Sequence, residues 1–176
     1  MKGKMLLGLT AILMLTGAAV PVKADDVWKF DAQRFVLKEY TGTETDVVVP
    51  DTMDEGVPVK RLGTQLLAGS ETLTSVVVPD SVTILDVGAL SYDNNLSEIT
   101  LSSNLINIGW NAISSNDALT ELTIPASVCI IDSYAVSGCY ALKKIVFEGA
   151  CPLIGSEAFV MLSDDVVIYV PDDQIE

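Results

Sequence analysis

A leucine recurs at a fixed spacing of 23 residues in this 176-residue chain, at Leu73, Leu96, Leu119 and Leu142. A fixed period in the twenties is typical of solenoid proteins, in which each repeat forms one coil that packs only against its neighbours. Counted from that leucine, positions 4, 6, 10, 13, 17 and 18 of each copy also carry small or apolar side chains. The repeat therefore predicts a stack of coils that share one continuous core.

Each copy is predicted to open with a short β-strand. Positions 4 and 6 are two residues apart, so their side chains point to the same side of a strand, and most of them are β-branched. In several copies a proline at position 7 ends the strand, as Pro79 and Pro125 do. Stacked copies would therefore place these strands side by side in a parallel sheet.

The second half of each copy is predicted to contain a tight turn and a return segment. Position 14 alternates between glycine and aspartate, as at Gly109 and Asp132, and this alternation suits a turn, including one with positive φ. The pair of alanine and an apolar residue at positions 17 and 18, such as Ala89 and Leu90, is expected to begin a short helical or irregular return segment.

Partial copies extend the array at both ends. Copies begin near residues 44, 73, 96, 119, 142 and 165, and the first contains a six-residue insertion around MDEGVP, so the repeat domain is expected over 44–176. The last strand lies in DDVVIYVPDDQIE, where acidic pairs flank an apolar run. We expect no cap at this end, with the acidic pairs protecting the edge strand against pairing with other chains.

Residues 25–43 are predicted to form an N-terminal cap. Trp28 and Phe30 alternate with charged residues, a polar DAQR turn follows, and Phe35 and Leu37 continue the alternation. This pattern is typical of a β-hairpin, which could cover the open side of the first coil. Trp28 could instead stack against a ligand, although capping is the simpler interpretation.

The repeat pattern LxxLxLPxxVxxIxxxAFxxCxxL resembles the BspA-type leucine-rich repeats of bacterial surface proteins. Residues 73–164 carry the pattern in full, and residues 44–72 carry it with the insertion. The resemblance implies a β-rich solenoid of the α/β type, a right-handed leucine-rich-repeat array with a parallel sheet on its concave face. It also implies a role in interaction or adhesion. The chain departs from the pattern in the cysteine of the return segment, which it retains only at Cys139.

The first 24 residues, MKGKMLLGLTAILMLTGAAVPVKA, have the composition of a secretory signal peptide. Lys2 and Lys4 form a positive n-region, an almost unbroken apolar stretch follows, and cleavage is expected after Ala24. A membrane anchor is the alternative, but the apolar stretch is short for a membrane span. No second long apolar stretch follows, so we expect a secreted or cell-surface protein that is not held in a membrane after cleavage.

Charge and composition narrow the classes of partner and of chemistry. Removing residues 1–24 takes away three of the 10 basic residues and none of the 24 acidic ones, which leaves 7 and 24 and a net charge of −17. Such a surface repels nucleic acids and anionic lipids and keeps the protein soluble. The chain has no histidine, which excludes Ser-His-Asp and Cys-His catalysis and His-ligated zinc. No calcium-loop spacing, phosphate loop or paired catalytic carboxylates occur, so we expect no enzyme, cofactor or metal site.

The three cysteines have different expected environments. Cys139 matches the structural cysteine of the family pattern and is expected inside a coil, and Cys151 occupies core position 10. Cys129 lies at position 11 of the preceding copy and is expected to face outwards. A disulfide between Cys129 and Cys151 on adjacent coils is one possibility.

The strand positions that the core does not use are the candidate binding surface. In leucine-rich repeats, positions 2, 3 and 5 face the concave side, where an extracellular or cell-surface protein or glycan could bind. Glu98 and Glu121 are expected to be neighbours there, and Lys144 is expected to pair with Glu121. The alternative is a solvated face on a spacer domain, or on a remnant of a larger surface protein. The candidate residues are Asp46, Ser75, Glu98, Thr100, Glu121, Thr123, Lys143, Lys144 and Tyr169.

Overall fold

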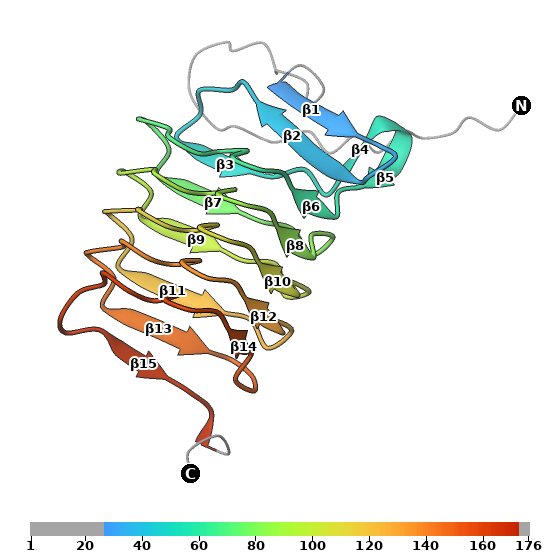
Figure 1. Ribbon diagram of the computed structural model, residues 1–176. Coiled ribbons are helices and arrows are strands. Elements are labelled where there is room, and N and C mark those ends of the chain that lie inside the picture. Colours follow the sequence, from blue (N-terminus) through green and yellow to red (C-terminus); the bar gives the residue numbers. More distant parts are fainter. Residues whose placement is uncertain (1–26, 173–176) are drawn as a thin grey trace, which may run out of the picture.

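The computed structural model describes residues 27–172, which form a solenoid of stacked coils (Figure 1). The predicted signal peptide lies outside the described residues. Each coil contributes two short strands that are joined by turns, so the strands line up in two columns along the stack. Apart from single helical residues at the two ends of the described range, the one helical element within residues 27–172 is the 3-10 turn η1 (Asp54–Gly56). The return segments are therefore irregular rather than helical, and none of these residues forms a helix that could cross a membrane.

The first column contains the strands that open the copies, and they are parallel and in register as predicted. Val47 lies opposite Val76 and Val76 opposite Ile99, so position 4 of one coil stacks on position 4 of the next. Leu122 and Ile145 repeat this register further along. The strands are β3 (Asp46–Val48), β7 (Ser75–Val77), β9 (Glu98–Thr100), β11 (Glu121–Ile124), β13 (Lys144–Phe147) and β15 (Val167–Tyr169).

The ladder of the first column is interrupted once. Its strands form two three-stranded sheets, β3-β7-β9 and β11-β13-β15. Within the described part of the chain, no ladder pair joins β9 to β11. This interruption, which we call the seam, divides the first column into two halves.

A second parallel sheet forms at positions 12 and 13 of each copy, where the sequence predicted a core residue at position 13 but no strand. The side chain at position 12 of a copy faces outwards and the side chain at position 13 is buried, as Asn107 and Ile108 show. The sheet has seven strands in the order β1-β2-β6-β8-β10-β12-β14, so it also includes the N-terminal hairpin. Its parallel two-residue strands are β6 (Arg61–Leu62), β8 (Ile84–Leu85), β10 (Asn107–Ile108), β12 (Ile130–Ile131) and β14 (Leu153–Ile154).

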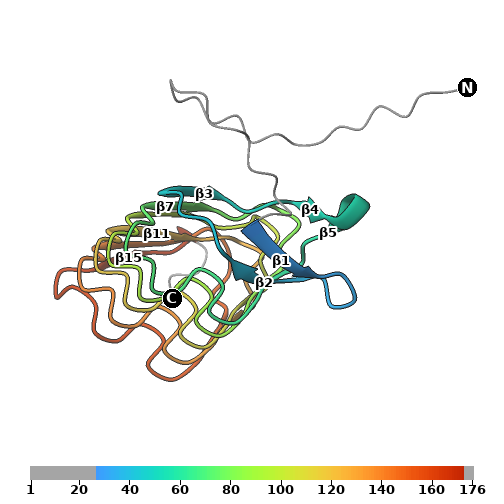
Figure 2. The ribbon, with the colours of Figure 1, turned by 90° about the horizontal axis from the view of Figure 1, so that it is seen from above.

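The N-terminal hairpin consists of β1 (Trp28–Asp31) and β2 (Val36–Tyr40), which pair antiparallel, as the sequence predicted. The strand β2 then pairs in parallel with β6, so the hairpin covers the first coil by continuing the second sheet (Figure 2). Trp28 is buried, with its ring centroid 4.3 Å from that of Tyr40, so it packs as part of the cap. The insertion around MDEGVP forms a small hairpin of β4 (Thr52–Met53) and β5 (Val57–Pro58).

The prediction for one residue of the hairpin, Phe35, is wrong. Phe35 was expected to alternate with Leu37 on the buried face, but its side chain is 42% exposed. The turn after Asp31 ends with Phe35 in the left-handed conformation, at φ 56°. This extra kink shifts the alternation by one residue, so Val36 and Leu37 are the buried pair instead.

The predicted turn at position 14 is also displaced. Gly109 does not have a positive φ; instead, a Cβ atom there would lie 2.6 Å from the carbonyl oxygen of Leu85 on the preceding coil. Close approach of two backbones therefore explains the glycine. The left-handed residues lie at position 16 (Gln65, Gly88, Asn111, Tyr134, Glu157) and position 20 (Gly69, Tyr92, Ser115, Gly138, Met161).

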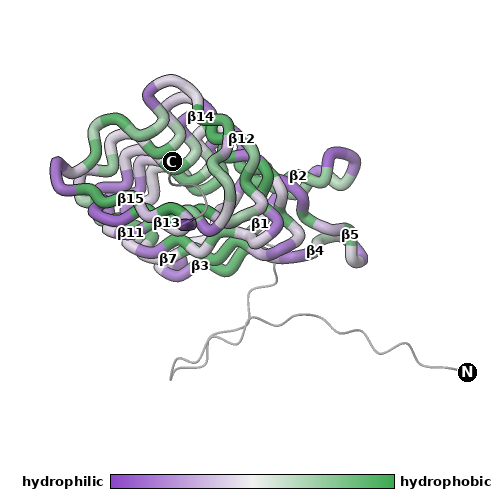
Figure 3. Tube along the Cα trace, turned by 90° about the horizontal axis from the view of Figure 1, so that it is seen from below, coloured by the Kyte–Doolittle hydropathy of each residue, from purple (hydrophilic) through white to green (hydrophobic). Residues whose placement is uncertain are grey.

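The core runs along the stack and becomes exposed at the C-terminal end. The four repeat leucines are buried, and the polar segments lie at corners of the coils and at the tip of the β1–β2 hairpin (Figure 3). Ile154 and Ile168 occupy core positions 13 and 4 of the last coils, yet they are 46% and 50% exposed. Equivalent residues in earlier coils are buried because a further coil covers them.

The cysteines follow the same gradient of burial. Cys139 is buried and Cys129 is exposed, as predicted. Cys151 is exposed although it lies at a core position, so its predicted burial is wrong; it belongs to the incompletely covered C-terminal part of the core. All three are free thiols, and the considered disulfide between Cys129 and Cys151 does not form in this structure.

Candidate functional site

The outward side chains of the first column form one surface, which we call the strand face. They occupy positions 3 and 5, and the parallel register aligns them in two rows along the stack. The first row contains Asp46, Ser75, Glu98, Glu121, Lys144 and Val167; the second contains Val48, Val77, Thr100, Thr123, Val146 and Tyr169. The structure thus places eight of the nine predicted site residues on the strand face, while Lys143 precedes β13 at its margin.

The N-terminal half of the strand face is organised around Asp46. Its carboxylate accepts hydrogen bonds from the hydroxyls of Ser75 at 2.6 Å, Thr74 at 3.0 Å and Thr45 at 3.1 Å. These hydrogen bonds, with that from Ser75 the strongest, lower the pKa of Asp46 below its usual value. Asp46 is therefore a carboxylate at neutral pH, with much of its acceptor capacity used by neighbouring hydroxyls.

The C-terminal half brings together an acidic, a basic and an aromatic side chain from three adjacent strands: Glu121, Lys144 and Tyr169. Lys144 Nζ lies 3.1 Å from Glu121 Oε2, which confirms the predicted pair, and 6.0 Å from the centroid of the Tyr169 ring. Because the Lys144 and Glu121 side chains are well exposed, their ion pair contributes less than about 1 kcal/mol to stability. Lys143 is turned towards the next coil, with its Nζ 3.7 Å from Asp165 Oδ2.

Glu98 and Glu121 occupy equivalent positions on either side of the seam. The sequence predicted them as neighbours of like charge, and the structure places no ladder pair between their strands. Like charges on adjacent strands oppose pairing, which agrees with an interruption at this point. Sequence reasoning also omitted Val48, Val77 and Val167 from the site because it favoured polar side chains, and all three are exposed.

A concave surface lies where the N-terminal hairpin meets the second sheet. This open groove has a volume of about 680 Å³. We call it the hairpin groove; the residues lining it include Gln33, Arg34, Phe35, Lys38, Arg61 and Asp86. Sequence reasoning missed it because Arg34 and Arg61 are far apart in the chain and are brought together only when β2 pairs with β6.

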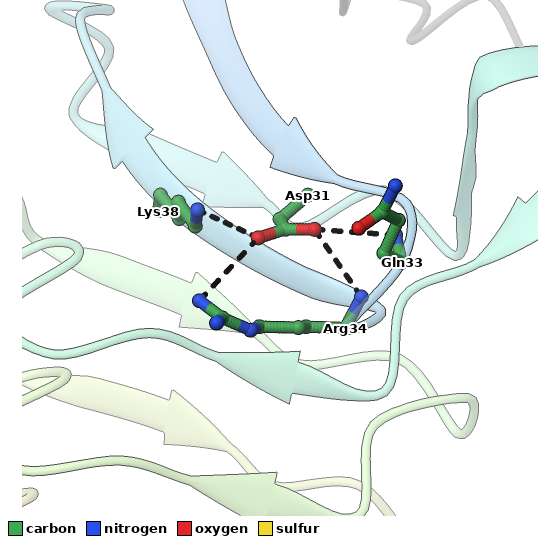
Figure 4. Close-up of polar contacts among 4 residues, drawn as sticks. All are labelled: Asp31, Gln33, Arg34 and Lys38. Carbon is green, nitrogen blue, oxygen red and sulfur yellow. Dashed lines mark hydrogen bonds and ion pairs between the residues drawn. The ribbon is translucent and has the colours of Figure 1, made fainter.

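Two carboxylates hold the cations beside the hairpin groove. Lys38 Nζ lies 2.6 Å from Asp31 Oδ2, and Arg34 Nη1 lies 3.9 Å from the same oxygen (Figure 4). Arg61 forms an ion pair with Asp86. The hydrogen bond from Lys38 is the main reason that the pKa of Asp31 lies below its usual value.

A ladder of polar side chains runs inside the solenoid at position 21. Asp93 Oδ1 accepts a hydrogen bond from the Ser70 amide at 2.6 Å, and Asn116 Oδ1 accepts one from the Asp93 amide at 3.0 Å. Cys139 continues the ladder, with its thiol 3.2 Å from the carbonyl oxygen of Ile113. Burial of Asp93 raises its pKa to about 7. These residues are fully buried, so we assign the ladder to the stability of the fold rather than to binding.

The described residues contain no group of three or more histidine, cysteine, aspartate or glutamate side chains that could hold a metal ion. The two surfaces differ in form: the strand face carries two rows of mixed side chains, and the hairpin groove is a concavity with three cationic side chains.

Sequence comparison identifies the family. The profile of the BspA type leucine rich repeat region matches six copies over residues 60–172, which is more than half of the chain. The chain belongs to the BspA-type leucine-rich repeat family. Membership agrees with the stacked coils, the short parallel strands and the near absence of helix. No curated protein matches this chain.

Solved structures of bacterial leucine-rich proteins share the fold. A leucine-rich repeat protein from Bacteroides capillosus is 34% identical, with a TM-score of 0.59 over 69% of this chain and 93% of that one. A leucine rich cell surface protein from Faecalibacterium prausnitzii is 24% identical, with a TM-score of 0.59 over 68% of this chain. The pneumococcal vaccine antigen PcpA is 18% identical, with a TM-score of 0.65 over 82% of this chain. The chain spans only 31% of the Faecalibacterium protein and 41% of PcpA.

Proposed function

We propose that this chain is an exported interaction protein whose strand face binds an extracellular or cell-surface protein, in the manner of an adhesion factor. The observation that carries the proposal is the cluster of Glu121, Lys144 and Tyr169 on three adjacent paired strands. Exposed tyrosines are enriched at protein interfaces, and charged side chains such as Glu121 and Lys144 suit the polar rim that surrounds an interface core. The family and the fold are typical of binding proteins rather than enzymes.

The extent and composition of the strand face favour a protein partner over a glycan. It spans six short strands in two sheets, and the exposed valines add apolar area that a protein interface can bury. A glycan, a spacer role without any ligand, and attachment through a larger surface protein are the competing interpretations.

Binding by the strand face can be tested with purified protein covering residues 25–176. It would be applied to immobilised extracellular matrix proteins and bacterial-surface glycans. The double variant Lys144→Glu/Tyr169→Ala should weaken binding at least tenfold, about 1.4 kcal/mol, because it removes two central contacts. The matched control Asn107→Lys lies on the outward side of the second sheet and should leave binding unchanged. Binding that both variants retain would place the contact surface elsewhere.

Export can be tested independently of any ligand. Cells that produce the protein would be fractionated and probed with an antibody against residues 25–176, and the N-terminus of the exported protein would be sequenced. We expect it to begin at Asp25, in the cell-surface or medium fraction. A cytoplasmic protein that still begins at Met1 would contradict export. A surface-bound protein would favour adhesion, whereas a protein free in the medium would favour a secreted binding factor.

A further inference from the structure

The hairpin groove is a local concentration of positive charge on an acidic protein. Residues 25–176 have a net charge of −17 and contain seven basic residues. Five of these seven lie between residues 29 and 61. Arg34, Lys38 and Arg61 line the groove, and they come from the hairpin turn, from β2 and from β6. Their paired carboxylates are only two, Asp31 and Asp86. The cluster therefore carries one net positive charge, which fits one additional carboxylate.

Arg34 has the donors for such a carboxylate. Its side chain is 76% exposed, and its closest carboxylate oxygen, on Asp31, is 3.9 Å away, which is too far for a hydrogen bond. Lys38 lies closer to Asp31, at 2.6 Å, and Figure 4 shows both cations directed at the same carboxylate. A guanidinium presents planar pairs of N–H groups that match a carboxylate with two parallel hydrogen bonds.

Phe35 supplies an apolar surface in the same groove, at a conformational cost. It adopts φ 56°, a left-handed conformation that is unfavourable for a bulky side chain and that glycine usually occupies in such hairpin bulges. Its ring is nevertheless 42% exposed, so burial in the core does not explain the choice of phenylalanine. Other turn residues of this chain, such as Tyr92 and Tyr134, are left-handed as well, so the place of the exposed ring in the groove, rather than its backbone, distinguishes Phe35.

We propose that the hairpin groove binds an acidic sugar, a monocarboxylated unit such as a hexuronate of an extracellular glycan. The sugar carboxylate would accept hydrogen bonds from Arg34, with Arg61 and Lys38 adding to the positive field, and the C–H face of the sugar ring would pack on Phe35. The groove volume of about 680 Å³ lies within the roughly 300–1,000 Å³ that is typical of small-molecule sites. The proposal concerns a different surface from the strand face and does not depend on the function proposed above.

A sugar fits these residues better than an acidic peptide does. A single net positive charge accommodates one carboxylate, whereas a segment with several acidic residues would also meet Asp31 and Asp86. An inorganic anion would use the arginines but would gain nothing from Phe35. The combination of one exposed, weakly paired guanidinium with one exposed ring therefore favours a ligand that has one carboxylate and one apolar face.

The experiment titrates residues 25–176 with glucuronate and, in parallel, with glucose, following the amide signals of residues 31–38 and 61–64 by NMR. We expect saturable shifts with glucuronate and none with glucose, and the double variant Arg34→Gln/Arg61→Gln should lower the affinity at least tenfold. Equal shifts with both sugars, or no shifts with either, would overturn the proposal. Tighter binding of a tetra-aspartate peptide than of glucuronate would overturn it in favour of an acidic protein ligand.

Phe35→Gly separates a role in binding from a role in folding. Glycine accepts the left-handed backbone, so this variant should keep its melting temperature within a few degrees while losing glucuronate binding. The matched control is Tyr92→Gly, because Tyr92 is also exposed and left-handed, at φ 62°, but lies outside the groove. It should bind glucuronate like the parent protein, as should Lys144→Glu/Tyr169→Ala. Full binding by Phe35→Gly would show that the ring does not contact the sugar.

Discussion

At the scale of single residues, Asp93 and Asn116 occupy the same position of successive coils, but their side chains differ in how completely they are hydrogen-bonded. The Asn116 amide donates hydrogen bonds to the carbonyl oxygens of Leu90 at 2.8 Å and Ile113 at 2.9 Å. Asp93 Oδ2 is buried without a partner. A carboxylate oxygen cannot donate a hydrogen bond as the Asn116 amide does. Burial disfavours the charged form of Asp93 and raises its pKa from the usual value to about 7.

The pH dependence of stability follows from this shift. Because the pKa of Asp93 is higher in the folded state than in the unfolded state, the folded protein binds more protons between about pH 4 and pH 7. The contribution of this carboxyl group to stability is therefore fully present at low pH and is lost as the pH rises through 7. Asp93→Asn should raise the free energy of unfolding at pH 8 by about 1–3 kcal/mol, because it restores a donor to a buried site.

Denaturant unfolding at pH 5 and at pH 8 would check this prediction. The gain from Asp93→Asn should be smaller at pH 5, where the parent carboxyl group is protonated. Glu98→Gln is the control, because it removes an exposed carboxylate. It should leave the difference in the free energy of unfolding between pH 5 and pH 8 as it is in the parent protein. A gain that is the same at both pH values would show that ionisation of Asp93 is not its cause.

At the scale of secondary structure, the seam gives β11 a different environment from the strands around it. The amides of Glu98 and Lys144 donate to carbonyl oxygens of the preceding coil, those of Thr74 and Thr120, at 3.3 and 3.2 Å. Within the described part of the chain, the equivalent amide of Glu121 has no such bond. We predict that the Glu121 amide exchanges its hydrogen faster than those of Glu98 and Lys144, measured by hydrogen–deuterium exchange with NMR.

Replacing a like charge at the seam should close it. Glu98→Lys would place opposite charges at equivalent positions of β9 and β11, which stabilises paired strands by about 0.2–1 kcal/mol. Exchange of the Glu121 amide should then slow, while exchange of the Lys144 amide should not change. If the Glu121 amide is as well protected as Lys144 in the parent protein, the ladder is continuous in solution and charge repulsion does not interrupt it.

The two strand columns differ in how well the sequence predicts them. The first column has apolar side chains at positions 4 and 6 and a proline that ends the strand, so a period of two and a stop signal are both visible. The second column has two-residue strands such as Asn107–Ile108, which are too short to show a period and exist only because the neighbouring coil pairs with them. The left-handed position 16 carries five different residue types, including Tyr134 and Glu157, so its composition gives no signal either.

The candidate surfaces also differ in how well the sequence predicts them. The strand face was predictable because alternation along one strand fixes which side chains point outwards. The hairpin groove was not, because it requires the pairing of β2 with β6 and the left-handed conformation of Phe35. Burial of Cys151 was predicted from its repeat position, but position alone cannot show whether a neighbouring coil covers it.

At the scale of the whole molecule, each coil depends on the coil that covers it, so the same substitution should have different costs along the stack. Ile145 and Ile168 both occupy position 4 and lie opposite each other in β13 and β15. Ile145 is fully buried, whereas Ile168 is 50% exposed. An aspartate at residue 145 would bury an unpaired charge, whereas at residue 168 the charge would stay partly hydrated.

Ile145→Asp should therefore cost about 4 kcal/mol or more and unfold coils on both sides of it, because a one-dimensional array loses the interfaces to both neighbours. Ile168→Asp should cost about 1 kcal/mol and leave the circular dichroism spectrum and the exchange protection of β7 unchanged. Thermal unfolding followed by circular dichroism, together with exchange measured at Val76 in β7, would compare them. If Ile145→Asp unfolded only β13 and β15 while Val76 stayed protected, the coils would be independent units, and the array would not fold cooperatively.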